Sequence, residues 1–426
     1  MNKLLGCLMM TAVTTSAFAQ GSTVSPYSQF GIGEMAPQGV GATRAMNGLG
    51  IGFHRGNQVN PLNPASYASV DSLTMLFDMG LSGQMTNFEE NGAKKNANTA
   101  NFDYAVGSFR AWRNVGISFG VLPLSNMGYK YSSSETLTEP SMTYKGEGGL
   151  HQLFMGVGVR PFKPLSVGFN MGYLWGGYDK TVTPISSTSS VNILSRRYKA
   201  DVNNYTLDFG LQYDIRLSKS DLLTLGVTYG YGHKLNSDAE CLEINTNATI
   251  SKADTTKTVV KNALELPHTF GAGFTYSHGS KWLIGADAQL QRWGDTQFPE
   301  MGSDGYVLRS QQMKDNYRFT IGGELCPRWN SRNFFHRIRY RVGAGYTTPY
   351  YNINGKEGPK QLSASLGFGI PIMNAYSNRS LLNISALNIS AQWVNTSAQG
   401  LIKENSFRIN LGLTFNERWF AKWKVE

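Results

Sequence analysis

The chain has 426 residues, of which 47 are glycine, 12% are aromatic and only 16% are charged. The low charge and the many aromatic side chains exclude intrinsic disorder. Because Glu and Lys do not dominate, the composition also argues against a helical bundle or a coiled coil. An all-β fold is favoured. The length does not force a division into several domains, since strand-rich folds often form one large unit.

The first nineteen residues have the three parts of an export signal. Lys3 supplies the positive start, residues 4–13 are mostly apolar, and residues 17–19 (Ala-Phe-Ala) form a small-residue cleavage site. We therefore expect a signal peptide over residues 1–19 and a mature chain that begins at Gln20. Cys7 is preceded by too short an apolar segment to be a lipoprotein signal.

The mature chain contains no second targeting or cross-linking signal. No stretch approaches the roughly 18 apolar residues of a membrane-spanning helix, so the product is either soluble outside the cytoplasm or crosses a membrane as a β-barrel. Its two cysteines, Cys241 and Cys326, lie in unlike contexts, which argues against a disulfide framework. Without Lys3 the chain keeps 38 basic and 29 acidic residues, a net charge of +9. These charges are dispersed and form no nucleic-acid module, so anionic lipid or glycan is the expected partner.

Residues 20–70 are rich in Gly, Ser, Pro and Asn and are expected to form an irregular N-terminal segment. From Ser72 onward, apolar residues alternate with small or polar ones, which is the period of a strand with one apolar face. In 205–215, for example, every second residue is apolar. Fourteen such stretches are predicted: 72–84, 102–112, 114–124, 149–160, 164–177, 203–215, 221–234, 265–277, 281–293, 316–327, 336–348, 360–372, 379–395 and 405–417.

An even number of strands is typical of single-chain barrels in the bacterial outer membrane. We therefore predict an all-β fold, a 14-stranded antiparallel transmembrane β-barrel over residues 71–417, followed by a periplasmic tail at 418–426. Outer-membrane lipid and lipopolysaccharide would then be the immediate partners of the apolar outer face.

In the first part of the chain, up to residue 315, short and long connections between the predicted strands alternate. The long connections are polar, and they surround Asn91, Ser134, Thr188, Thr246 and Ser303. Outer-membrane barrels have short periplasmic turns and longer extracellular loops, so these five positions are predicted to lie outside the cell. Tryptophans fall near both strand ends and predict two aromatic girdles, with Trp112, Trp282, Trp329 and Trp419 on the short-turn side and Trp175, Trp293 and Trp393 on the long-loop side.

A short motif, Asn63, Pro64 and Ala65, lies shortly before the first predicted strand. In this motif the sequence resembles the FadL/TodX family of outer-membrane transporters. Two further similarities are residues 266–268 (Leu-Pro-His), which open a predicted strand, and Asp287 within the next predicted strand. Residues 25–33 and 340–341 are similar to the branch of this family found in Bacteroidota. The resemblance implies a barrel closed by an N-terminal hatch, here residues 20–70. From the motif alone, a simple turn that ends the hatch is the favoured interpretation of the three residues.

The resemblance also implies a function, the hatch-gated passage of hydrophobic small molecules such as fatty acids. Family members use a kink in the third strand as a lateral exit. Pro123 ends the matching stretch and cannot donate a backbone hydrogen bond, so it is predicted to mark that opening. FadL-like barrels also serve as non-transporting subunits of larger outer-membrane complexes for protein insertion, secretion or nutrient uptake. Partners would then be other outer-membrane proteins or lipoproteins instead of a hydrophobic ligand.

Charged residues at the predicted lumen positions distinguish this sequence from an apolar tunnel. If residues 338, 340, 342 and 344 face lipid, the intervening arginines face inward, because a lipid-facing Arg near the midplane costs about 2–4 kcal/mol. The predicted lumen set is Arg337, Arg339, Arg341, Arg318, Glu324, Asp208, Asp214, Asp287 and Arg408. Two interpretations stay open: a salt-bridge lattice that holds the hatch against the wall, or a site for a carboxylate or phosphate headgroup.

Enzymatic interpretations find no support in the sequence. The six histidines, His54, His151, His233, His268, His278 and His336, are scattered without the spacing of a metal site. No nucleophile elbow is present, and the glycine clusters near residues 31 and 50 lack the strand-to-helix context of a dinucleotide fold. We expect no catalysis, no metal and no cofactor.

Overall fold

The computed structural model describes residues 23–133, 141–185, 192–247, 252–310, 312–353, 355–372 and 385–418. The predicted signal peptide, the tail beyond residue 418 and the loop positions Ser134 and Thr188 lie outside these residues. Within them, no helix is both long enough and apolar enough to cross a membrane.

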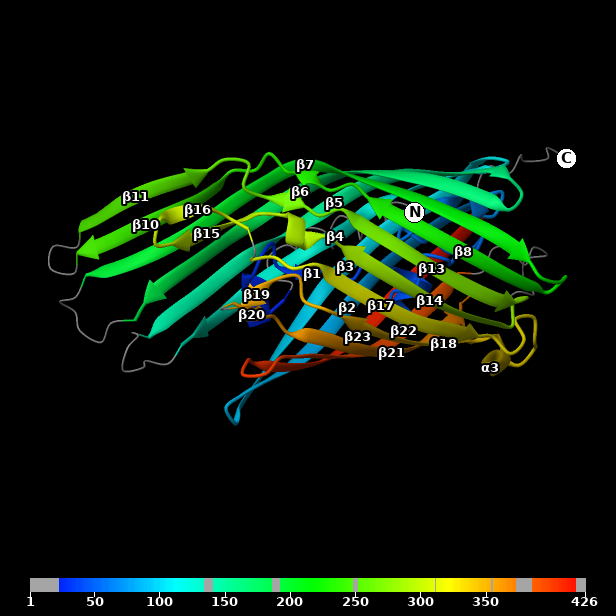
Figure 1. Cartoon of the computed structure of the whole chain (residues 1–426). Coiled ribbons are helices and arrows are strands. Elements are labelled where there is room, and N and C mark those ends of the chain that lie inside the picture. The colour runs from blue at the N-terminus through cyan, green and yellow to red at the C-terminus, as the bar shows by residue number, and fades with distance from the viewer. Residues whose placement is uncertain are drawn as a thin grey trace, which may run out of the picture.

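Fourteen long antiparallel strands form a closed ring (Figure 1). Each strand pairs with its neighbours along the chain, and β2 pairs with the last strand, β23, from Thr74 opposite Arg418 to Glu89 opposite Lys403. The ring therefore closes without leaving an edge at its ends. Its strands are β2 (Thr74–Glu90), β3 (Ala93–Trp112), β4 (Val115–Ser132), β5 (Met142–Phe162), β6 (Leu165–Pro184), β7 (Ile193–Arg216), β8 (Asp221–Gly230), β13 (Thr269–His278), β14 (Trp282–Gln291), β17 (Asn316–Leu325), β18 (Arg339–Thr347), β21 (Lys360–Pro371), β22 (Ala386–Ser397) and β23 (Lys403–Arg418).

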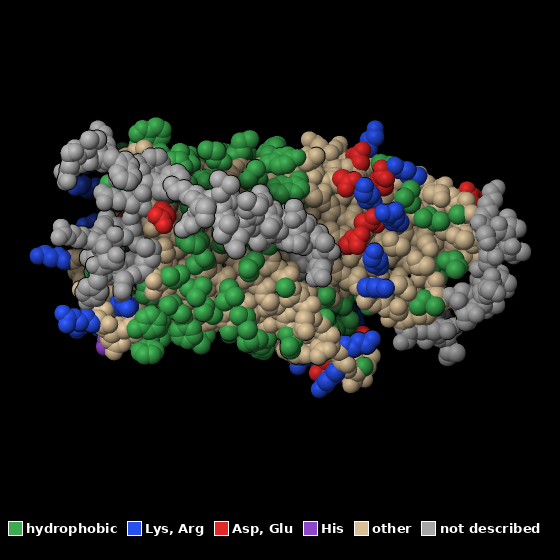
Figure 2. All heavy atoms as spheres, turned by 180° about the vertical axis from the view of Figure 1, so that it is seen from behind, with side chains coloured by type: hydrophobic (Ala, Val, Ile, Leu, Met, Phe, Trp, Pro, Cys, Tyr) green, Lys and Arg blue, Asp and Glu red, His purple; other side chains and the backbone are tan. Residues whose placement is uncertain are grey.

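Alternation along each strand separates a lipid face from a lumen face. On β17, Ile321 is 61% exposed on the outer surface, whereas Thr320 and Glu324 are buried. Seen from behind, hydrophobic side chains form a broad band over the left half of the barrel, with charged side chains at the left end and in a belt just right of the middle (Figure 2). This arrangement is typical of a barrel that spans the hydrocarbon core of a membrane.

The remaining elements lie inside the ring or at its ends. The segment before the barrel carries η1 (Pro26–Gln29), β1 (Glu34–Met35), α2 (Gly41–Ala45) and η2 (Pro64–Ser69). A short helix, α3 (Phe334–Arg337), lies in the connection between β17 and β18. The other long connections carry β9 (His233–Lys234), β10 (Ala239–Asn247), β11 (Lys252–Val260), β12 (Glu265–Leu266), η3 (Trp293–Asp295), β15 (Phe298–Gly302), β16 (Gly305–Arg309), β19 (Asn352–Ile353) and β20 (Lys356–Glu357).

The predicted 14-stranded barrel is confirmed, and every predicted stretch overlaps a strand of the ring. The largest difference is on the long-loop side, where the strands continue beyond the predicted ends. The expected loop at 85–101 is mostly strand, with only Asn91 and Gly92 between β2 and β3. Above the membrane both faces of a strand meet water, so the apolar alternation that marks a strand is lost although pairing continues.

One of the predicted girdle tryptophans does not lie in a girdle. Trp293 is 1% exposed and packs against Tyr350 with ring centroids 4.8 Å apart. It belongs to η3, where the chain has already left strand β14 and turned inward. Trp112 and Trp393, in contrast, are exposed on the outer surface as predicted, and Trp419 lies outside the described residues.

We expect single cysteines to report the orientation of the barrel. A Ser303→Cys variant, at the turn between β15 and β16, should react with a membrane-impermeant maleimide on intact cells, because long connections face outward. Lys219→Cys, at the short turn between β7 and β8, should react only after the cells are opened. The parent is the control, since its described cysteines are buried. Labelling of position 219 but not of position 303 on intact cells would show that the barrel has the opposite orientation.

Candidate functional site

The N-terminal segment, residues 23–70, lies inside the barrel (Figure 1). Met46, Leu49 and Phe53 are almost completely buried and form an apolar cluster with Leu283 of the wall. Such an irregular segment can exist at membrane depth only when protein surrounds it and supplies hydrogen-bond partners. The contacts between this segment and the wall therefore form the candidate functional site.

The motif Asn63, Pro64 and Ala65 lies at a point of close approach between the segment and the wall. Asn63 caps η2 by accepting a hydrogen bond from the Ala65 amide (3.1 Å), and Pro64 occupies the first helical position. A Cβ atom on Gly168 would lie 2.2 Å from the carbonyl carbon of Pro64, and one on Gly210 would lie 2.0 Å from Asn63 Oδ1. Four adjacent strands contribute a glycine to this bed: Gly116, Gly158, Gly168 and Gly210. The motif thus seats the segment on the wall.

Two of the predicted lumen residues bind the backbone of the segment. Asp287 Oδ2 accepts hydrogen bonds from the amides of Gly50 (2.7 Å) and Ile51 (2.9 Å). Arg318 Nη2 donates to the carbonyl of Asn47 (3.0 Å). Hydrogen bonds to charged groups are stronger than neutral ones, so these contacts hold the bend of the segment against β14 and β17.

A buried ion cluster ties the same segment to β17 and β18. The carboxylate of Glu324, 1% exposed, lies 2.7 Å from a guanidinium nitrogen of each of Arg55, Arg339 and Arg341. Arg341 also donates to Asn388 on β22 (2.6 Å). The structure therefore brings together three predicted lumen residues and adds Arg55, a residue of the N-terminal segment that the sequence analysis did not single out.

Arg337, which was predicted to stack with Arg339 and Arg341, lies elsewhere. Asn333 caps the short helix α3, and the chain stays helical through Arg337 before β18 begins. The guanidinium of Arg337 lies over the Phe334 ring, 5.9 Å from its centroid. The alternation from which its inward position was predicted holds only from Arg339 onward, because only there is the backbone a strand.

The other predicted lumen residues are distributed around the ring. Asp214 Oδ1 lies 2.9 Å from His54 Nε2, and so provides another link to the N-terminal segment. Asp208 lies opposite Asn170 on β6. Arg408 binds the side-chain oxygen of Gln84, with Nε 2.8 Å away. The charged members of this set mostly have protein partners, and they are spread around the ring instead of forming a single ladder.

A second set of anchors, on β2 and β3, was missed by the sequence analysis. Arg44 of α2 forms a buried ion pair with Asp103. The hydroxyl of Tyr104 accepts from the Gly41 amide (2.7 Å) and donates to Asp78 (2.9 Å). One feature of the sequence could have indicated these anchors: Asp78 is a carboxylate at a lumen position of the first predicted strand. Its partners could not be identified, because they lie in other elements.

The wall has a seam at Pro123. β3 and β4 pair only over Ala105–Trp112, and among the described strands none covers this edge of β3 before Ala105. β4 has a bulge after Pro123. Beyond it β1 of the N-terminal segment pairs with β4, with Met35 opposite Ser125, and Gln38 donates to the Pro123 carbonyl (2.7 Å). The N-terminal segment thus covers the seam from inside.

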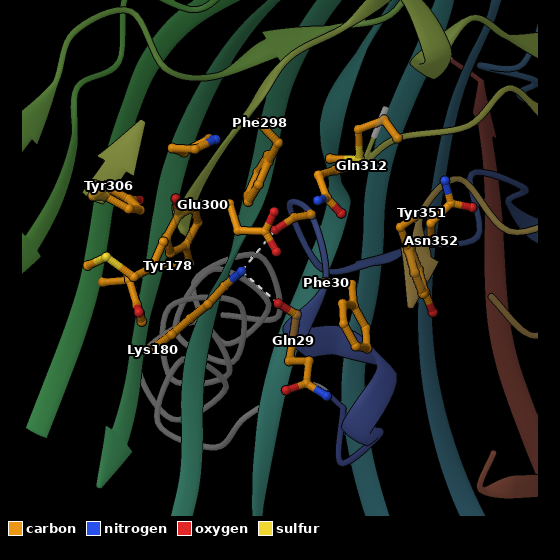
Figure 3. A pocket seen from close by; sticks show the side chains of 15 residues that line it. Gln29, Phe30, Tyr178, Lys180, Phe298, Glu300, Tyr306, Gln312, Tyr351 and Asn352 are labelled. Atoms are coloured by element: carbon orange, nitrogen blue, oxygen red, sulfur yellow. Dashed lines mark hydrogen bonds between the residues drawn. The ribbon is translucent and has the colours of Figure 1, made fainter. Parts of the chain in front are cut away.

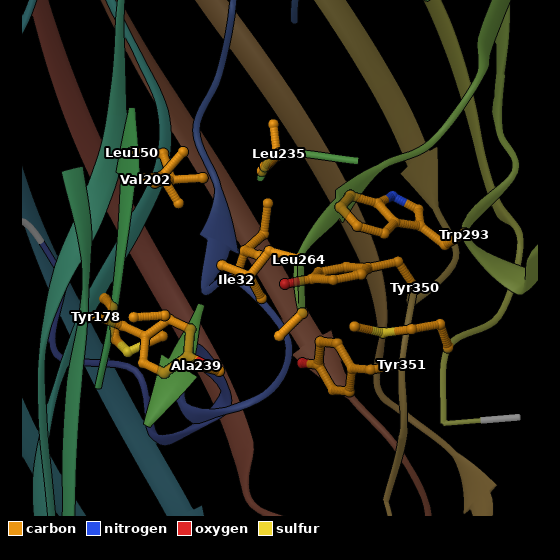
Figure 4. Packing of buried hydrophobic residues seen from close by; sticks show 14 of the residues in the cluster. Ile32, Leu150, Tyr178, Val202, Leu235, Ala239, Leu264, Trp293, Tyr350 and Tyr351 are labelled. Carbon is orange, nitrogen blue, oxygen red and sulfur yellow. The ribbon is translucent and has the colours of Figure 1, made fainter. Parts of the chain in front are cut away.

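The cavities near the segment are small and partly polar. One, of about 230 Å³, lies between the segment and the wall, and its lining includes Gln84, Gln289, Arg318, Gln392, Glu404 and Arg408. Toward the long-loop end, apolar side chains fill the interior by packing on one another (Figure 4). Tyr350 lies in the middle of this cluster, between Trp293 and Tyr351.

A closed barrel of fourteen strands with an apolar outer band defines this protein as a FadL-like barrel of the bacterial outer membrane. More narrowly, the chain belongs to the BamG family, whose model matches residues 1–426. No curated protein matches the chain in sequence.

Solved structures share the fold at low sequence identity. The P. putida toluene transporter TodX is 14% identical, with a TM-score of 0.63 over 91% of this chain and 100% of that one. A Pseudomonas aeruginosa FadL homologue is 11% identical, with a TM-score of 0.64 over 90% and 99%. The CymD monoaromatic hydrocarbon channel is 14% identical, with a TM-score of 0.60 over 91% and 100%. These similarities concern the fold and leave the activity to be argued from the chain itself.

We expect Glu324→Gln to destabilise the protein more than any single change among its arginines. The substitution leaves three buried guanidinium groups without a carboxylate, and breaking a buried ion pair from one side costs about 3–5 kcal/mol. Arg339→Gln should cost less, because Glu324 keeps two partners. Urea unfolding in detergent measures both effects.

The matched control is Asp201→Asn, which removes the carboxylate of an exposed ion pair with Lys199. Exposed pairs contribute about 0–1 kcal/mol, so this variant should unfold close to the parent. A Glu324→Gln variant as stable as Asp201→Asn would show that the cluster does not hold the segment.

Proposed function

We propose that this protein is a sealed, non-transporting barrel that acts as a subunit of a larger outer-membrane complex for protein insertion, secretion or nutrient uptake. The observation that carries the proposal is the Glu324 cluster, in which two wall arginines and Arg55 of the N-terminal segment share one buried carboxylate. A segment that opened for cargo would have to pull Arg55 away from this carboxylate, which would leave the buried Arg55 guanidinium without its ion-pair partner.

The distribution of the anchors supports a plug that does not move. Ion pairs or charged hydrogen bonds hold the segment at β3 through Asp103, at β7 through Asp214, at β14 through Asp287 and at β17 through Glu324. Gating segments pivot on a few hinge residues and leave one side free to move. Anchors on several sides of the ring instead favour a segment that opens only when many interactions break together.

The chemistry of the interior also disfavours hydrophobic cargo. In the cavity between the segment and the wall, amides, hydroxyls and guanidinium groups share the lining with apolar side chains such as Leu62, Leu124 and Val394. An apolar molecule there would displace the water that hydrates these groups, and each polar group left unpaired costs about 1–3 kcal/mol. We also propose that the protein is not an enzyme. Within the described ranges, no cluster of three or more His, Cys, Asp or Glu residues could hold a metal ion.

The proposed partners are other outer-membrane proteins or lipoproteins. The match to the BamG family covers the whole chain, whereas the hydrocarbon channels share only the fold. A barrel whose lumen is filled can still contribute its outer wall, its turns and its loops to an assembly. Such a role requires rigidity rather than an open path, and the anchored segment provides it.

Single-channel recording tests the seal. The parent in planar bilayers should be closed, and a variant that lacks residues 23–60 should conduct steadily, because the lumen then holds water in place of the segment. The double variant Arg339→Gln/Arg341→Gln should open intermittently. Arg337→Gln is the matched control and should remain closed, since Arg337 lies outside the cluster. A parent that conducts steadily would contradict the sealed barrel.

A second function, passage of a hydrophobic molecule through the wall, is favoured by the seam at Pro123. β1 covers this seam, and its pairing with β4 offers a direct test, because Met35 lies opposite Ser125. A disulfide between Met35→Cys and Ser125→Cys should leave toluene uptake by cells unchanged if the barrel is sealed. The same variant after reduction is the control. Loss of uptake on oxidation and recovery on reduction would instead support a lateral exit.

A further inference from the structure

The lipid-facing wall of the barrel has a groove that the proposed function does not use. It has a volume of about 680 Å³ and is lined by residues of β14, β17, β18, β21, β22 and β23. Ala344 of β18 lies directly opposite Ala364 of β21, and these two small side chains are part of its floor. In the same row of the sheet, the larger side chains of Ile321 and Trp393 flank them. The groove is therefore a fixed depression between bulky apolar side chains.

The groove reaches close to the short-turn end of the wall. β17 ends at Leu325 and β18 begins at Arg339. Gly323 and Val342 line the groove and lie two and three residues from these ends, which is within about 10 Å along the strands. Because the short turns are predicted to be periplasmic, the inner leaflet surrounds this part of the wall. An acyl chain in the groove would contact protein on several sides, and dispersion contacts add up along its length.

The connection between β17 and β18, which contains α3, lies against the outer face at this end of the groove (Figure 1). Tyr340 is on the same outward-facing row of β18 as Val342, and its hydroxyl donates to the carbonyl of Phe335 (3.1 Å). Phe335 itself is 65% exposed. The connection is held in shape by further hydrogen bonds, such as that from the Arg328 amide to the His336 carbonyl (2.9 Å). An ordered element with exposed aromatic rings at this level is typical of a membrane–water interface.

Three cations around this connection have no anionic partner within the described residues. Arg328 and Arg332 are exposed, and neither guanidinium takes part in an ion pair or a side-chain hydrogen bond. Lys281 lies beside the connection, because its carbonyl accepts from the Cys326 amide (2.6 Å), and its ammonium is also unpaired. The carboxylate of β17, Glu324, faces the lumen and is shared by three other arginines. The positive charge next to the groove is therefore uncompensated.

Several cations at the opposite end of the barrel are, in contrast, satisfied by the chain itself. The ammonium of Lys180 donates to the carbonyls of Gln29 (2.7 Å) and Gly31 (3.1 Å) (Figure 3). Arg197 forms an ion pair with Asp179 on the neighbouring strand. The charged belt to the right of the middle in Figure 2 accordingly contains side chains of both signs. The cations beside the groove differ in that an anionic partner has to come from outside the chain.

We propose that the groove and the β17–β18 connection bind one anionic phospholipid of the inner leaflet, with an acyl chain in the groove and the phosphate on Arg328 and Arg332. A guanidinium suits this role because its parallel N–H donors match the oxygens of a phosphate. The third cation, Lys281, attracts a headgroup of net negative charge and repels the ammonium of a zwitterionic one.

A phospholipid fits both parts of the site, since it joins an anion to an apolar chain in one molecule. A free phosphate would leave the groove unused. An extended peptide in the groove would place its own backbone groups in hydrocarbon without hydrogen-bond partners. The inference does not depend on whether the barrel is sealed, because the site lies on the outer wall and the Glu324 cluster lies in the lumen.

Native mass spectrometry of the intact protein in an uncharged polyoxyethylene detergent tests the proposal by counting bound lipids. The probes are phosphatidylglycerol and phosphatidylethanolamine with the same acyl chains. One phosphatidylglycerol should bind each barrel, about fivefold more tightly than phosphatidylethanolamine. Arg328→Gln/Arg332→Gln should weaken this binding about tenfold, because the charged hydrogen bonds to the phosphate are lost. Ala364→Phe should weaken it by a similar factor, because the new ring fills the groove.

Each test variant has a matched control. Lys94→Gln/Lys95→Gln removes the same charge from exposed residues at the long-loop end of β3, and Ala272→Phe adds the same ring to the outer face of β13, outside the groove. Both controls should bind phosphatidylglycerol like the parent. Faster migration of unheated samples on detergent gels shows that each variant is folded.

Three results would overturn the proposal: no one-to-one binding of phosphatidylglycerol to the parent, equally tight binding of phosphatidylethanolamine, or a test variant that binds as its control does. Loss of a co-purifying protein from Ala364→Phe, with lipid binding unchanged, would assign this face to a protein partner instead.

Discussion

A polar group that leaves water needs a hydrogen-bond partner, and this requirement is strictest inside a membrane, because lipid supplies none. The fourteen strands satisfy it with one another by closing into a ring, so that β2 and β23 leave no free ends. The N-terminal segment cannot satisfy it alone, since its backbone is irregular. It depends on Asp287, Arg318 and Gln212 of the wall, which bind its amides and carbonyls directly.

The same requirement explains why charged residues occur where a transport path would be expected. Glu324 and Asp103 are buried, and each is paired with an arginine of the N-terminal segment. A buried ion pair adds little stability compared with an apolar contact but makes separation of its partners costly. Such pairs are therefore suited to hold a plug in one position, and less suited to a gate that must open and close repeatedly.

The N-terminal segment links the two ends of the molecule. At one end Arg55 completes the Glu324 cluster, and at the other end the carbonyls of Gln29 and Gly31 bind Lys180. The segment that we propose to seal the lumen thus also forms part of a pocket between β6 and the hairpin β15–β16.

The class of this protein and the order of its strands could be predicted from the sequence alone. Alternation with a period of two identifies each strand from its own residues, and connection length predicts which side of the membrane each loop faces. The sequence also indicated that Arg339, Arg341 and Glu324 turn away from lipid, because an outward position is too costly. It could not place Arg337, whose position depends on where α3 ends.

Which residues meet across the lumen could be learned only from the folded barrel. Arg55 and Glu324 are far apart in the chain, and no local pattern pairs them. In the sequence, Gly168 and Gly210 are small residues of strands like many others. Only in the structure is it clear that they leave room for Pro64 and Asn63, with which a Cβ atom would clash. Strand patterns are local, whereas partners inside a closed barrel are set by how the ring curves and by which element fills it. For that reason the site required the fold, while the fold could be predicted without the site.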